Sequence, residues 1–386
     1  MRILFTGGGT GGHIYPILAV AEKLKLSAQE KNIEANLYYM GSAGSYAGLL
    51  ESNGIKVSEV ISVKFRRYFD LRNILDILKF PFALIQAFWK VFFLMPDVLF
   101  SKSGPGALSV VLACGFYGIP IIIHESDAVA GLTNLISSRY AARIGISFPS
   151  AQDSFVNYFK NEKVRQKIIN NIALVGNPTR SFLMVTADRE AAKKSFGFDP
   201  QKPVILVICG SQGAVTINDF FLNSAASLSA ENFQILHQTG IKNFEQFNKE
   251  LNGALSVMGG RKDFYKAVPY FENNMQDAYA AADLVVSRSG SGSIFEIAAM
   301  RKPSILIPLA TSASDHQRKN AYEYAKTGAA IVIEESNFKY NIFISQLKKI
   351  FESPDNLRHM SEEAAKFSRP DSAQVIAEEI ISLGQK

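Results

Sequence analysis

Three glycine-rich segments, each of which follows an apolar run, are the strongest candidates for chemistry in this sequence. Residues 7–13 read GGGTGGH, residues 210–213 read GSQG, and residues 289–293 read SGSGS. Glycines let the backbone approach a ligand closely, and the start of a following helix offers unpaired N–H groups to an anion. With their serine hydroxyls, the second and third segments suit a diphosphate held without a metal ion. Each loop alone can also be explained as a tight turn between a strand and a helix.

Charged and titratable side chains lie beside these loops. His13 stands where the first loop meets the following helix, so it is a candidate general base, although a lone histidine is more often structural. Glu296 lies one turn into the helix after the third loop, within reach of a ribose diol if a diphosphate occupies that loop. A solvated glutamate favoured by the helix dipole is the alternative. Arg288, just before the third loop, can add positive charge.

A polar cluster follows a further apolar run. Its side chains supply donors and acceptors suited to sugar hydroxyls and an acetamido group, and they are Asp315, His316, Gln317 and Asn320. The alternative is helix capping by Ser314 or Asp315. Loops after parallel strands meet at one edge of a sheet, where ligands of open α/β sheets bind. The segments together are therefore a stronger prediction of a ligand site than any one of them.

The elements that must position these residues alternate between strands and helices, which is typical of an α/β protein with parallel sheets. A first set contains a helix over 17–26 and strands over 2–6, 35–40, 98–101, 119–123 and 142–147. A second set contains a helix over 294–300 and strands over 204–209, 284–287, 304–307 and 330–333. The turn-rich residues 176–179 suit a linker between the sets. Because both halves begin with a strand, a glycine loop and a helix, we predict two Rossmann-like domains that face one another.

Length and composition limit the class of protein. A chain of 386 residues suits two domains, and 47% hydrophobic with 20% charged residues excludes a disordered chain. The net charge of +6 fits nucleic acid, an anionic membrane or phosphorylated substrates without choosing among them. Cys114 and Cys209 lie in apolar runs, so we expect buried thiols. We expect no signal peptide, because residues 1–5 lead directly into a strand and a glycine loop.

Residues 74–95 raise the question of a membrane span. Spanning takes about 20 mostly apolar residues, and each central charge costs roughly 2.5–3.5 kcal/mol. Polar residues and a proline interrupt this segment, so we expect it not to span; they are Asp76, Lys79, Pro81, Gln86 and Lys90. We predict instead that residues 64–89 lie on an anionic membrane surface through aromatic side chains and the basic residues Lys64, Arg66, Arg67 and Arg72. A core helix with a solvated basic loop is the alternative.

Motifs in a fixed order cover nearly the whole chain. They are GGGTGGHIYP at 7–16, HESDAVAGLTN at 124–134, GNPTR at 176–180, GSQGA at 210–214, RSGSGSIFEIAA at 288–299, DHQRKNA at 315–321 and RPDSA at 369–373. In these motifs the chain resembles the MurG family, the UDP-N-acetylglucosamine-dependent transferases that act on undecaprenyl-pyrophosphoryl-muramyl peptide in peptidoglycan synthesis. The resemblance implies a GT-B fold, with an acceptor domain over 1–176, a donor domain over 177–369 and a last helix, 370–386, that returns to the first domain.

The resemblance also implies a role for particular residues. The residues expected to bind the donor are Thr10, Gly11, Gly12, Asp127, Arg180, Ser211, Phe271, Ser291, Gly292, Ser293, Ile294, Phe295, Glu296, His316, Gln317 and Asn320. Acceptor binding falls to Ser103, Gly104, His124 and Glu125. The chain departs from the family in having HESD where HEQN is usual, so Asp127 replaces an asparagine. It also has Ser103-Gly104-Pro105 where a GGY-type glycine loop is usual.

The reaction that the resemblance implies is a single inverting displacement. The 4-hydroxyl of the muramyl sugar attacks N-acetylglucosamine, UDP leaves, and His13 is the expected base. Loop N–H groups and Arg180 would stabilise the diphosphate, so we expect neither a metal nor a cofactor. The expected partners are UDP-N-acetylglucosamine, a polyprenyl-pyrophosphate-linked muramyl peptide and the anionic cytoplasmic face of the cell membrane, with no nucleic acid.

Other functions stay open from the sequence. A related transferase acting on another lipid acceptor, such as diacylglycerol, would use a similar donor site. A UDP-sugar epimerase shares the two-domain architecture but needs acid and base carboxylates that we cannot place. The chain could also be a non-catalytic sugar-nucleotide-binding subunit at the membrane, although both glycine loops and His13 argue against this.

Overall fold

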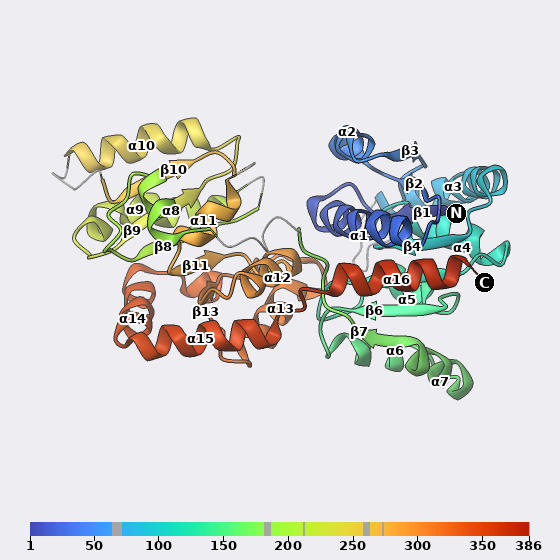
Figure 1. Cartoon of the computed structure of the whole chain (residues 1–386). Coiled ribbons are helices and arrows are strands. Elements are labelled where there is room, and N and C mark those ends of the chain that lie inside the picture. The colour runs from blue at the N-terminus through green and yellow to red at the C-terminus, as the bar shows by residue number, and fades with distance from the viewer. Residues whose placement is uncertain (64–71, 181–186, 211–212, 258–262, 272–273, 386) are drawn as a thin grey trace. The chain divides into compact units, whose positions relative to one another are not determined.

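The computed structural model describes residues 1–63, 72–180, 187–210, 213–257, 263–271 and 274–385. The chain divides into two compact units (Figure 1). Residues 1–180 together with 369–386 form the first unit, and residues 181–368 form the second. Each unit is built on one parallel sheet with helices packed on it. The prediction of an α/β protein with two Rossmann-like domains is thus confirmed.

A seven-stranded parallel sheet forms the centre of the first unit, in the order β3-β2-β1-β4-β5-β6-β7. β1 pairs with β2 on one side and with β4 on the other, so the strand order reverses between β1 and β4. Such a reversal is the place where open α/β sheets bind ligands. The strands are β1 (Arg2–Thr6), β2 (Asn36–Gly41), β3 (Ile55–Glu59), β4 (Val98–Ser101), β5 (Ile121–Glu125), β6 (Arg143–Ile146) and β7 (Ile172–Leu174).

Alternating side chains of β1 divide the core of this unit into two layers, because successive side chains of a strand point to opposite faces. Ile3 and Phe5 pack in the layer that holds α1 and α16, whereas Leu4 packs in the layer that holds α3 and α4. The helices are α1 (Gly11–Glu30), α2 (Ala47–Ser52), α3 (Arg72–Leu94), α4 (Ala107–Phe116), α5 (Leu132–Ser137), α6 (Ala151–Tyr158), α7 (Glu162–Asn171) and α16 (Ser372–Gly384).

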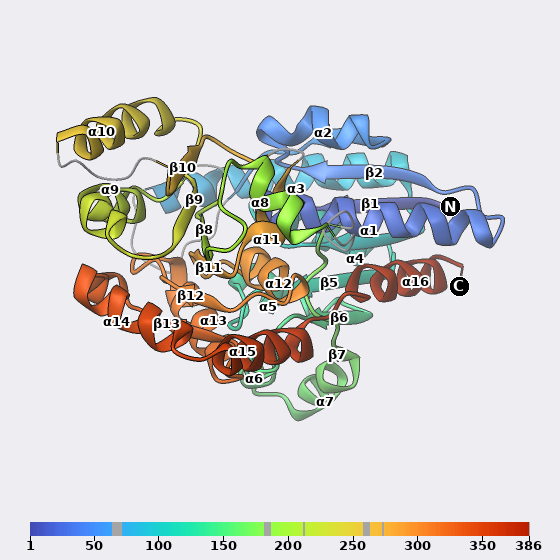
Figure 2. The same ribbon diagram turned by 60° about the vertical axis from the view of Figure 1, so that its left-hand side comes forward.

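The last helix of the chain belongs to the first unit. α16 lies along α1 in both views (Figures 1 and 2). Gln374 donates a hydrogen bond of 3.0 Å to the hydroxyl of Ser27 on α1, and Arg143 forms an ion pair of 2.8 Å with Glu379. The apolar face of α16 fills the same core layer as α1. Residues from the two ends of the sequence therefore complete one layer of this core.

A six-stranded parallel sheet forms the second unit, in the order β10-β9-β8-β11-β12-β13. Its strands are β8 (Val204–Ile208), β9 (Gln234–Gln238), β10 (Tyr265–Val268), β11 (Leu284–Ser287), β12 (Ser304–Leu306) and β13 (Ala330–Val332). Its helices are α8 (Arg189–Ser195), α9 (Val215–Ser229), α10 (Phe244–Val257), α11 (Met275–Ala281), α12 (Ser291–Ala299), α13 (His316–Ala325), α14 (Tyr340–Phe351) and α15 (Pro354–Phe367). β8 and β11 are fully buried, as their apolar runs predict.

Four strands lie outside the apolar runs that the sequence analysis identified. β3, β7 and β10 are at the edges of their sheets and expose part of their side chains, so they lack a continuous apolar run. β9 is internal but carries the buried polar residues Gln234, His237 and Gln238. β5 ends two residues later than expected, because the polar residues His124 and Glu125 continue its ladder against β6.

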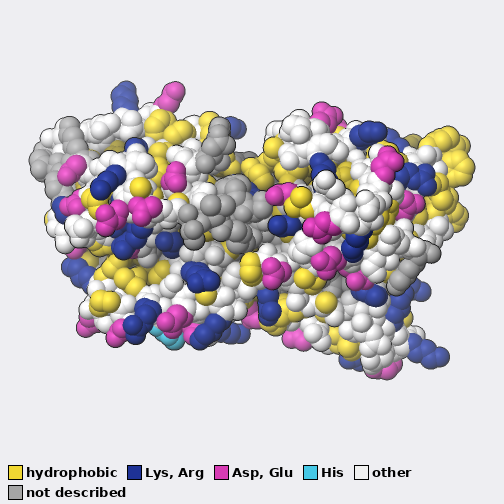
Figure 3. All heavy atoms as spheres, viewed as in Figure 1, with side chains coloured by type: hydrophobic (Ala, Val, Ile, Leu, Met, Phe, Trp, Pro, Cys, Tyr) yellow, Lys and Arg dark blue, Asp and Glu magenta, His cyan; other side chains and the backbone are white. Residues whose placement is uncertain are grey.

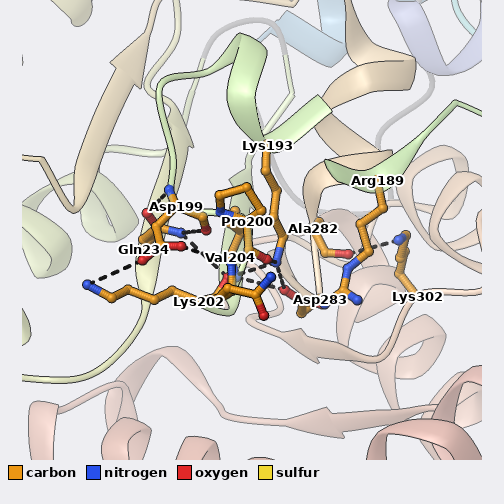
Figure 4. Close-up of polar contacts among 11 residues, drawn as sticks. Arg189, Lys193, Asp199, Pro200, Lys202, Val204, Gln234, Ala282, Asp283 and Lys302 are labelled. Carbon is orange, nitrogen blue, oxygen red and sulfur yellow. Dashed lines mark hydrogen bonds and ion pairs between the residues drawn. The ribbon is translucent and has the colours of Figure 1, made fainter. Parts of the chain in front are cut away.

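A buried ionic cluster fastens the amino-terminal edge of the second sheet (Figure 4). Asp283 directly precedes β11, and its Oδ2 accepts hydrogen bonds from the backbone N–H of Val204 at 2.9 Å and from Lys193 Nζ at 3.0 Å. Arg189 pairs with the other carboxylate oxygen. Lys193 is only 1% exposed and also donates to the carbonyl of Lys202 at 2.7 Å. The cluster thus connects α8 to the starts of β8 and β11.

We predict that Asp283→Asn lowers the free energy of unfolding of the second unit by about 3–5 kcal/mol, because it leaves the Lys193 ammonium buried without its counter-charge. Urea unfolding followed by circular dichroism measures this loss. The matched control is Glu162→Gln, which removes an exposed ion pair with Arg165 and should leave stability unchanged. Equal midpoints for the Asp283 variant and wild type would contradict a structural role for the cluster.

Candidate functional site

The first glycine loop, which joins β1 to α1, places His13 in the first turn of α1, at the carboxyl-terminal edge of the seven-stranded sheet. The first helical hydrogen bonds of α1 run from the N–H groups of His13 and Ile14 to the carbonyl of Thr10, both at 3.0 Å. The Thr10 hydroxyl does not cap the helix but lies 2.8 Å from His13 Nδ1. When Nδ1 donates to this hydroxyl, Nε2 is the basic nitrogen of the ring.

The loop after β4 packs backbone against backbone on the first glycine loop. Gly104 has a φ of +101°, and a Cβ at this position would lie 2.5 Å from the backbone nitrogen of Gly8. The same Cβ would lie 3.3 Å from His13 Nε2. Ser103 also has a positive φ, of +65°. The expected acceptor residues Ser103 and Gly104 therefore lie beside the candidate base, and only a glycine fits the position that touches it.

The surroundings of His13 keep its ring neutral at pH 7. Burial lowers the pKa of His13 to about 4; the positive charge of Lys102 also lowers this pKa, and the carboxylate of Asp127 opposes the shift. A general base must be unprotonated before it can accept a proton. The site therefore provides an imidazole in the form that a base requires.

Lys102, which the sequence analysis missed, is the centre of a buried hydrogen-bond network. It follows β4 and is only 2% exposed. Its Nζ lies 2.7 Å from His124 Nδ1, 2.5 Å from the hydroxyl of Ser126 and 3.1 Å from Asn177 Oδ1. The available signal was a lysine directly after a buried apolar strand, beside a glycine loop. Lysines are almost never fully buried unless their charge is paired or hydrogen-bonded.

His124 and Glu125, expected to bind an acceptor, are buried groups that hold the loop after β5. His124 uses Nδ1 towards Lys102 and Nε2 towards the carbonyl of Gly176, at 2.8 Å. The Glu125 carboxylate accepts two backbone N–H groups and the side-chain amide of Asn134, at 2.9–3.0 Å. Both side chains direct their polar atoms into the protein and shape the site from within.

Arg180 and Tyr15 bring the segment after β7 against the start of α1. The guanidinium of Arg180 lies over the Tyr15 ring, 5.1 Å from its centroid, which is a favourable cation–π geometry. Tyr15 is two residues after His13 on α1. Arg180, which is expected at the donor diphosphate, thus packs against the start of α1, the helix that carries the candidate base His13. Asp127, another expected donor residue, is partly buried in the loop after β5.

In the second unit, the SGSGS loop after β11 begins α12. The N–H of Ile294 donates to the carbonyl of Gly290 at 3.1 Å, which closes the first turn. Ser289 donates its hydroxyl to the carbonyl of Gln317 at 2.7 Å, and Asn320 donates its amide to the carbonyl of Ser289 at 3.2 Å. These bonds fix the start of α12 against α13. The expected donor loop and the expected sugar-binding helix are therefore neighbours.

The residues expected to bind the donor along α12 differ in accessibility. Gly292, Ser293 and Glu296 are partly exposed, at and one turn beyond the start of the helix. Ile294 and Phe295 are fully buried, so only their backbone groups could serve a ligand. Ser291 is also buried. The helix start and the Glu296 carboxylate are thus the parts of this segment that a nucleotide can reach.

The polar cluster at the start of α13 is only partly open. His316 Nδ1 lies 2.7 Å from the carbonyl of Ala313, and the Gln317 side-chain oxygen accepts the N–H of Leu309 at 3.1 Å. Asn320 is fully buried. Asp315 makes no capping bond to α13 and pairs with Arg318 instead, so the capping alternative does not describe it.

Further donor residues expected from the sequence are enclosed or lie outside the described residues. Arg288 donates to the carbonyl of Ile307 at 3.2 Å and pairs with Glu335, so it braces the loop from behind. Phe271 is fully buried, with its N–H on the side-chain oxygen of Gln238 at 3.0 Å. Ser211 is not among the described residues. Within the described ranges, no group of three or more metal-ligating side chains occurs.

One face of α3 is apolar and exposed. Figure 3 shows hydrophobic side chains gathered over this helix, and the large exposed ones are Ile77, Leu78, Phe82, Ile85, Trp89, Phe92 and Phe93. A groove of about 530 Å³ runs among Leu84, Ile85, Phe88, Trp89, Phe92 and Tyr117. Of the helices in the described ranges, Asp76–Leu94 alone is long and apolar enough to cross a membrane.

Comparisons with known proteins match both units. Residues 3–146 match the glycosyltransferase family 28 N-terminal domain, and residues 204–376 match the C-terminal domain of the same family. A curated relative in Clostridium kluyveri is 34% identical over 90% of this chain and 91% of its own length. Its name is UDP-N-acetylglucosamine--N-acetylmuramyl-(pentapeptide) pyrophosphoryl-undecaprenol N-acetylglucosamine transferase.

Solved structures share the fold. The crystal structure of Acinetobacter baumannii MurG has a TM-score of 0.72 at 25% identity and covers 99% of both chains. A UDP-GlcNAc 2-epimerase from Neisseria meningitidis, bound to UDP-GlcNAc, has a TM-score of 0.66 at 14% identity, over 99% of this chain and 100% of that one. The second likeness is one of fold alone.

The two family 28 domains, the full-length relative and the MurG structure agree with the order of the motifs along the sequence. This chain belongs to glycosyltransferase family 28 and, within it, to the MurG family of N-acetylglucosamine transferases.

Proposed function

We propose that this protein is an inverting glycosyltransferase. It moves N-acetylglucosamine from UDP-N-acetylglucosamine to the 4-hydroxyl of the muramyl sugar in undecaprenyl-pyrophosphoryl-muramyl-pentapeptide, a step of peptidoglycan synthesis. The names of its full-length relatives support the substrates. The observation that carries the chemistry is His13, an imidazole kept neutral by its surroundings at the end of a glycine loop.

The displacement needs one base and one leaving-group site. The acceptor hydroxyl oxygen forms a bond to the anomeric carbon, the bond from that carbon to the UDP oxygen breaks, and its electron pair leaves with UDP. The hydroxyl proton passes to Nε2 of His13, the nitrogen not directed to Thr10. The N–H groups at the start of α12 offer positive charge to the departing diphosphate.

We further propose that the enzyme is peripheral on the cytoplasmic face of the membrane. α3 packs on its unit through Ala83, Ala87 and Val91, which are fully buried and spaced four residues apart on one face of the helix. Lys90 on α3 donates to the carbonyl of Glu59, the last residue of β3, at 2.6 Å. A helix that is attached to its own protein along one face and apolar on the other suits the membrane surface better than a span.

The basic cluster expected beside this helix falls largely outside the described residues. Lys64, Arg66 and Arg67 are not described, and neither is the side chain of Arg72. The proposal therefore rests on the exposed aromatic side chains of α3. Among them Phe82 is 66% exposed, Trp89 60% and Phe93 76%. Exposed apolar patches of this kind mark interaction surfaces, and a polyprenyl-linked acceptor stays in the bilayer.

We predict that the purified protein transfers labelled N-acetylglucosamine from UDP-N-acetylglucosamine to the polyprenyl-pyrophosphate-linked muramyl peptide, and that His13→Gln lowers kcat by about 10²–10⁴-fold with little change in UDP affinity. Thin-layer separation of the labelled lipid gives the rate, and calorimetry gives the affinity. Transfer to diacylglycerol instead would replace the proposed acceptor. Unchanged turnover in a folded His13 variant would remove this residue from the mechanism.

We predict that Glu296→Ala weakens UDP binding about tenfold or more, because hydrogen bonds between a charged carboxylate and the ribose contribute roughly 1.5–3 kcal/mol. Isothermal titration of UDP into both proteins measures the change. Glu363→Ala on α15 is the control, since this carboxylate pairs with the exposed Lys366 at the far end of its helix. The same affinity in wild type and the Glu296 variant would show that the ribose is bound elsewhere.

We predict that replacing Phe82, Trp89 and Phe93 together by serine lowers partitioning onto anionic vesicles about tenfold or more, because burying one large apolar side chain contributes roughly 1.5–3 kcal/mol. Co-sedimentation at low and moderate salt measures it. The control is the pair Ile342→Ser and Val375→Ser, two exposed apolar residues on α14 and α16. Equal pelleting of the triple variant and wild type would exclude α3 as the anchor.

A further inference from the structure

We propose that Lys102 is a positioning residue of the acceptor-side site: its buried ammonium group ties the loops after β4 and β5 to the Gly176–Asn177 segment, and its positive charge acts on His13. No contact with a substrate is required for this role, because Lys102 acts through its neighbours. The part of the proposal that concerns turnover rests on the proposed function. The part that concerns the state of His13 does not.

The hydrogen bonds of Lys102 are those of an ammonium group that donates to three acceptors. His124 Nε2 lies 2.8 Å from the carbonyl of Gly176, so it carries the proton, and Nδ1 then accepts from Lys102. The hydroxyl of Ser126 donates to Asn177 Oδ1 at 3.2 Å and accepts from Lys102. Asn177 Oδ1 also accepts from Lys102, at 3.1 Å. Each of the three ammonium protons therefore has a partner.

These three partners come from segments that are distant along the chain. His124 and Ser126 lie at and after the end of β5, whereas Asn177 follows β7. Asn177 is three residues before Arg180, whose guanidinium lies over Tyr15 on α1. One buried cation thus joins the β4 and β5 loops to the segment that carries the candidate diphosphate ligand. A residue at this junction sets the position of both catalytic elements of the first unit.

The charge of Lys102 also acts on His13. The charged groups that act on this ring are Lys102 after β4 and Asp127 after β5, and the Thr10 hydroxyl lies against its Nδ1. The other titratable groups on the surrounding elements are His124 and Glu125 at the end of β5, Tyr15 on α1 and Arg180, which lies over Tyr15. After burial, Lys102 is the next cause that lowers the pKa of His13, and Asp127 opposes it. Burial lowers the pKa of Lys102 itself to about 7, against the raising effect of Glu125 and Asp127.

These charges determine whether each substitution raises or lowers the pKa of His13. Removal of the cation in Lys102→Met stabilises the imidazolium and raises the pKa of His13, by about 1 unit. Removal of the anion in Asp127→Asn has the opposite effect and lowers that pKa. A base that is protonated at higher pH loses activity earlier as the pH falls, so the acidic limb of kcat/KM moves to higher pH in Lys102→Met.

The first experiment is an NMR pH titration of the full-length protein with labelled histidine. The chain has five histidines, and His13→Gln assigns the signal. We expect the His13 midpoint to rise in Lys102→Met and to fall in Asp127→Asn. The matched control is Lys193→Met, which removes an equally buried lysine from the second unit and should leave the His13 midpoint unchanged. An unmoved midpoint in both Lys102→Met and Asp127→Asn would overturn the proposal.

The second experiment compares kinetics across pH. We expect Lys102→Met to lower kcat about 10- to 100-fold with a smaller change in KM for UDP-N-acetylglucosamine, because misplaced catalytic groups cost rate more than binding. The acidic limb should shift with the NMR midpoint, and Lys102→Arg should return it towards wild type. If kcat falls in Lys102→Met but the acidic limb of the kcat/KM profile stays at its wild-type pH, Lys102 is only a structural cross-link. A wild-type protein with no transfer activity would count against the proposed function, and the titration would still decide the effect of Lys102 on His13.

Discussion

Parallel pairing is the constraint on which the arrangement of this protein depends. In the described sheets every strand pair is parallel, so each strand must be followed by a crossover before the next strand begins, and the carboxyl ends of the strands share one edge. The glycine loops after β1, β4 and β11 therefore lie at such edges, although they are far apart in sequence. Helix starts at the same edges add N–H groups aimed outward. The chemistry of each unit follows from this geometry.

Two buried lysines show how the two edges of a parallel sheet are used differently. Lys193 pairs with Asp283 at the amino-terminal edge of the second sheet and also bonds to backbone carbonyls. The role of Lys193 is structural, because it joins α8 to β8 and β11. Lys102 lies at the carboxyl-terminal edge of the first sheet and bonds to neutral acceptors. The carboxylates of Glu125 and Asp127 act on Lys102 electrostatically, and the positive charge of Lys102 in turn acts on His13.

The fold alone does not decide the activity. An epimerase that binds UDP-GlcNAc has the same architecture at 14% identity, so two Rossmann-like units accommodate different reactions of one sugar nucleotide. In this protein the carboxyl edge of the first sheet carries the neutral His13 and the loop packed against it at Gly104. The apolar face of α3 is a further feature of the first unit, because it leaves large apolar side chains exposed.

The sequence by itself determined the features that depend on neighbours along the chain. The apolar runs at β1, β4, β8 and β11 were found because fully buried strands need continuous apolar residues, and the glycine loops were found because they follow those runs directly. Edge strands such as β3 were not found, because half-exposed strands carry no such run. The order of motifs also sufficed to identify the family.

Only the tertiary structure decided which polar side chains are open to a ligand and which are enclosed. His124, Glu125 and Asn320 sit in motifs that resemble binding sites, yet they bond inward because loops distant in sequence enclose them. Lys102 had no visible partner in the sequence, since its acceptors lie 22 to 75 positions away. The physical reason is that a buried charge must be satisfied by whatever the fold brings to it, and sequence spacing does not record that proximity.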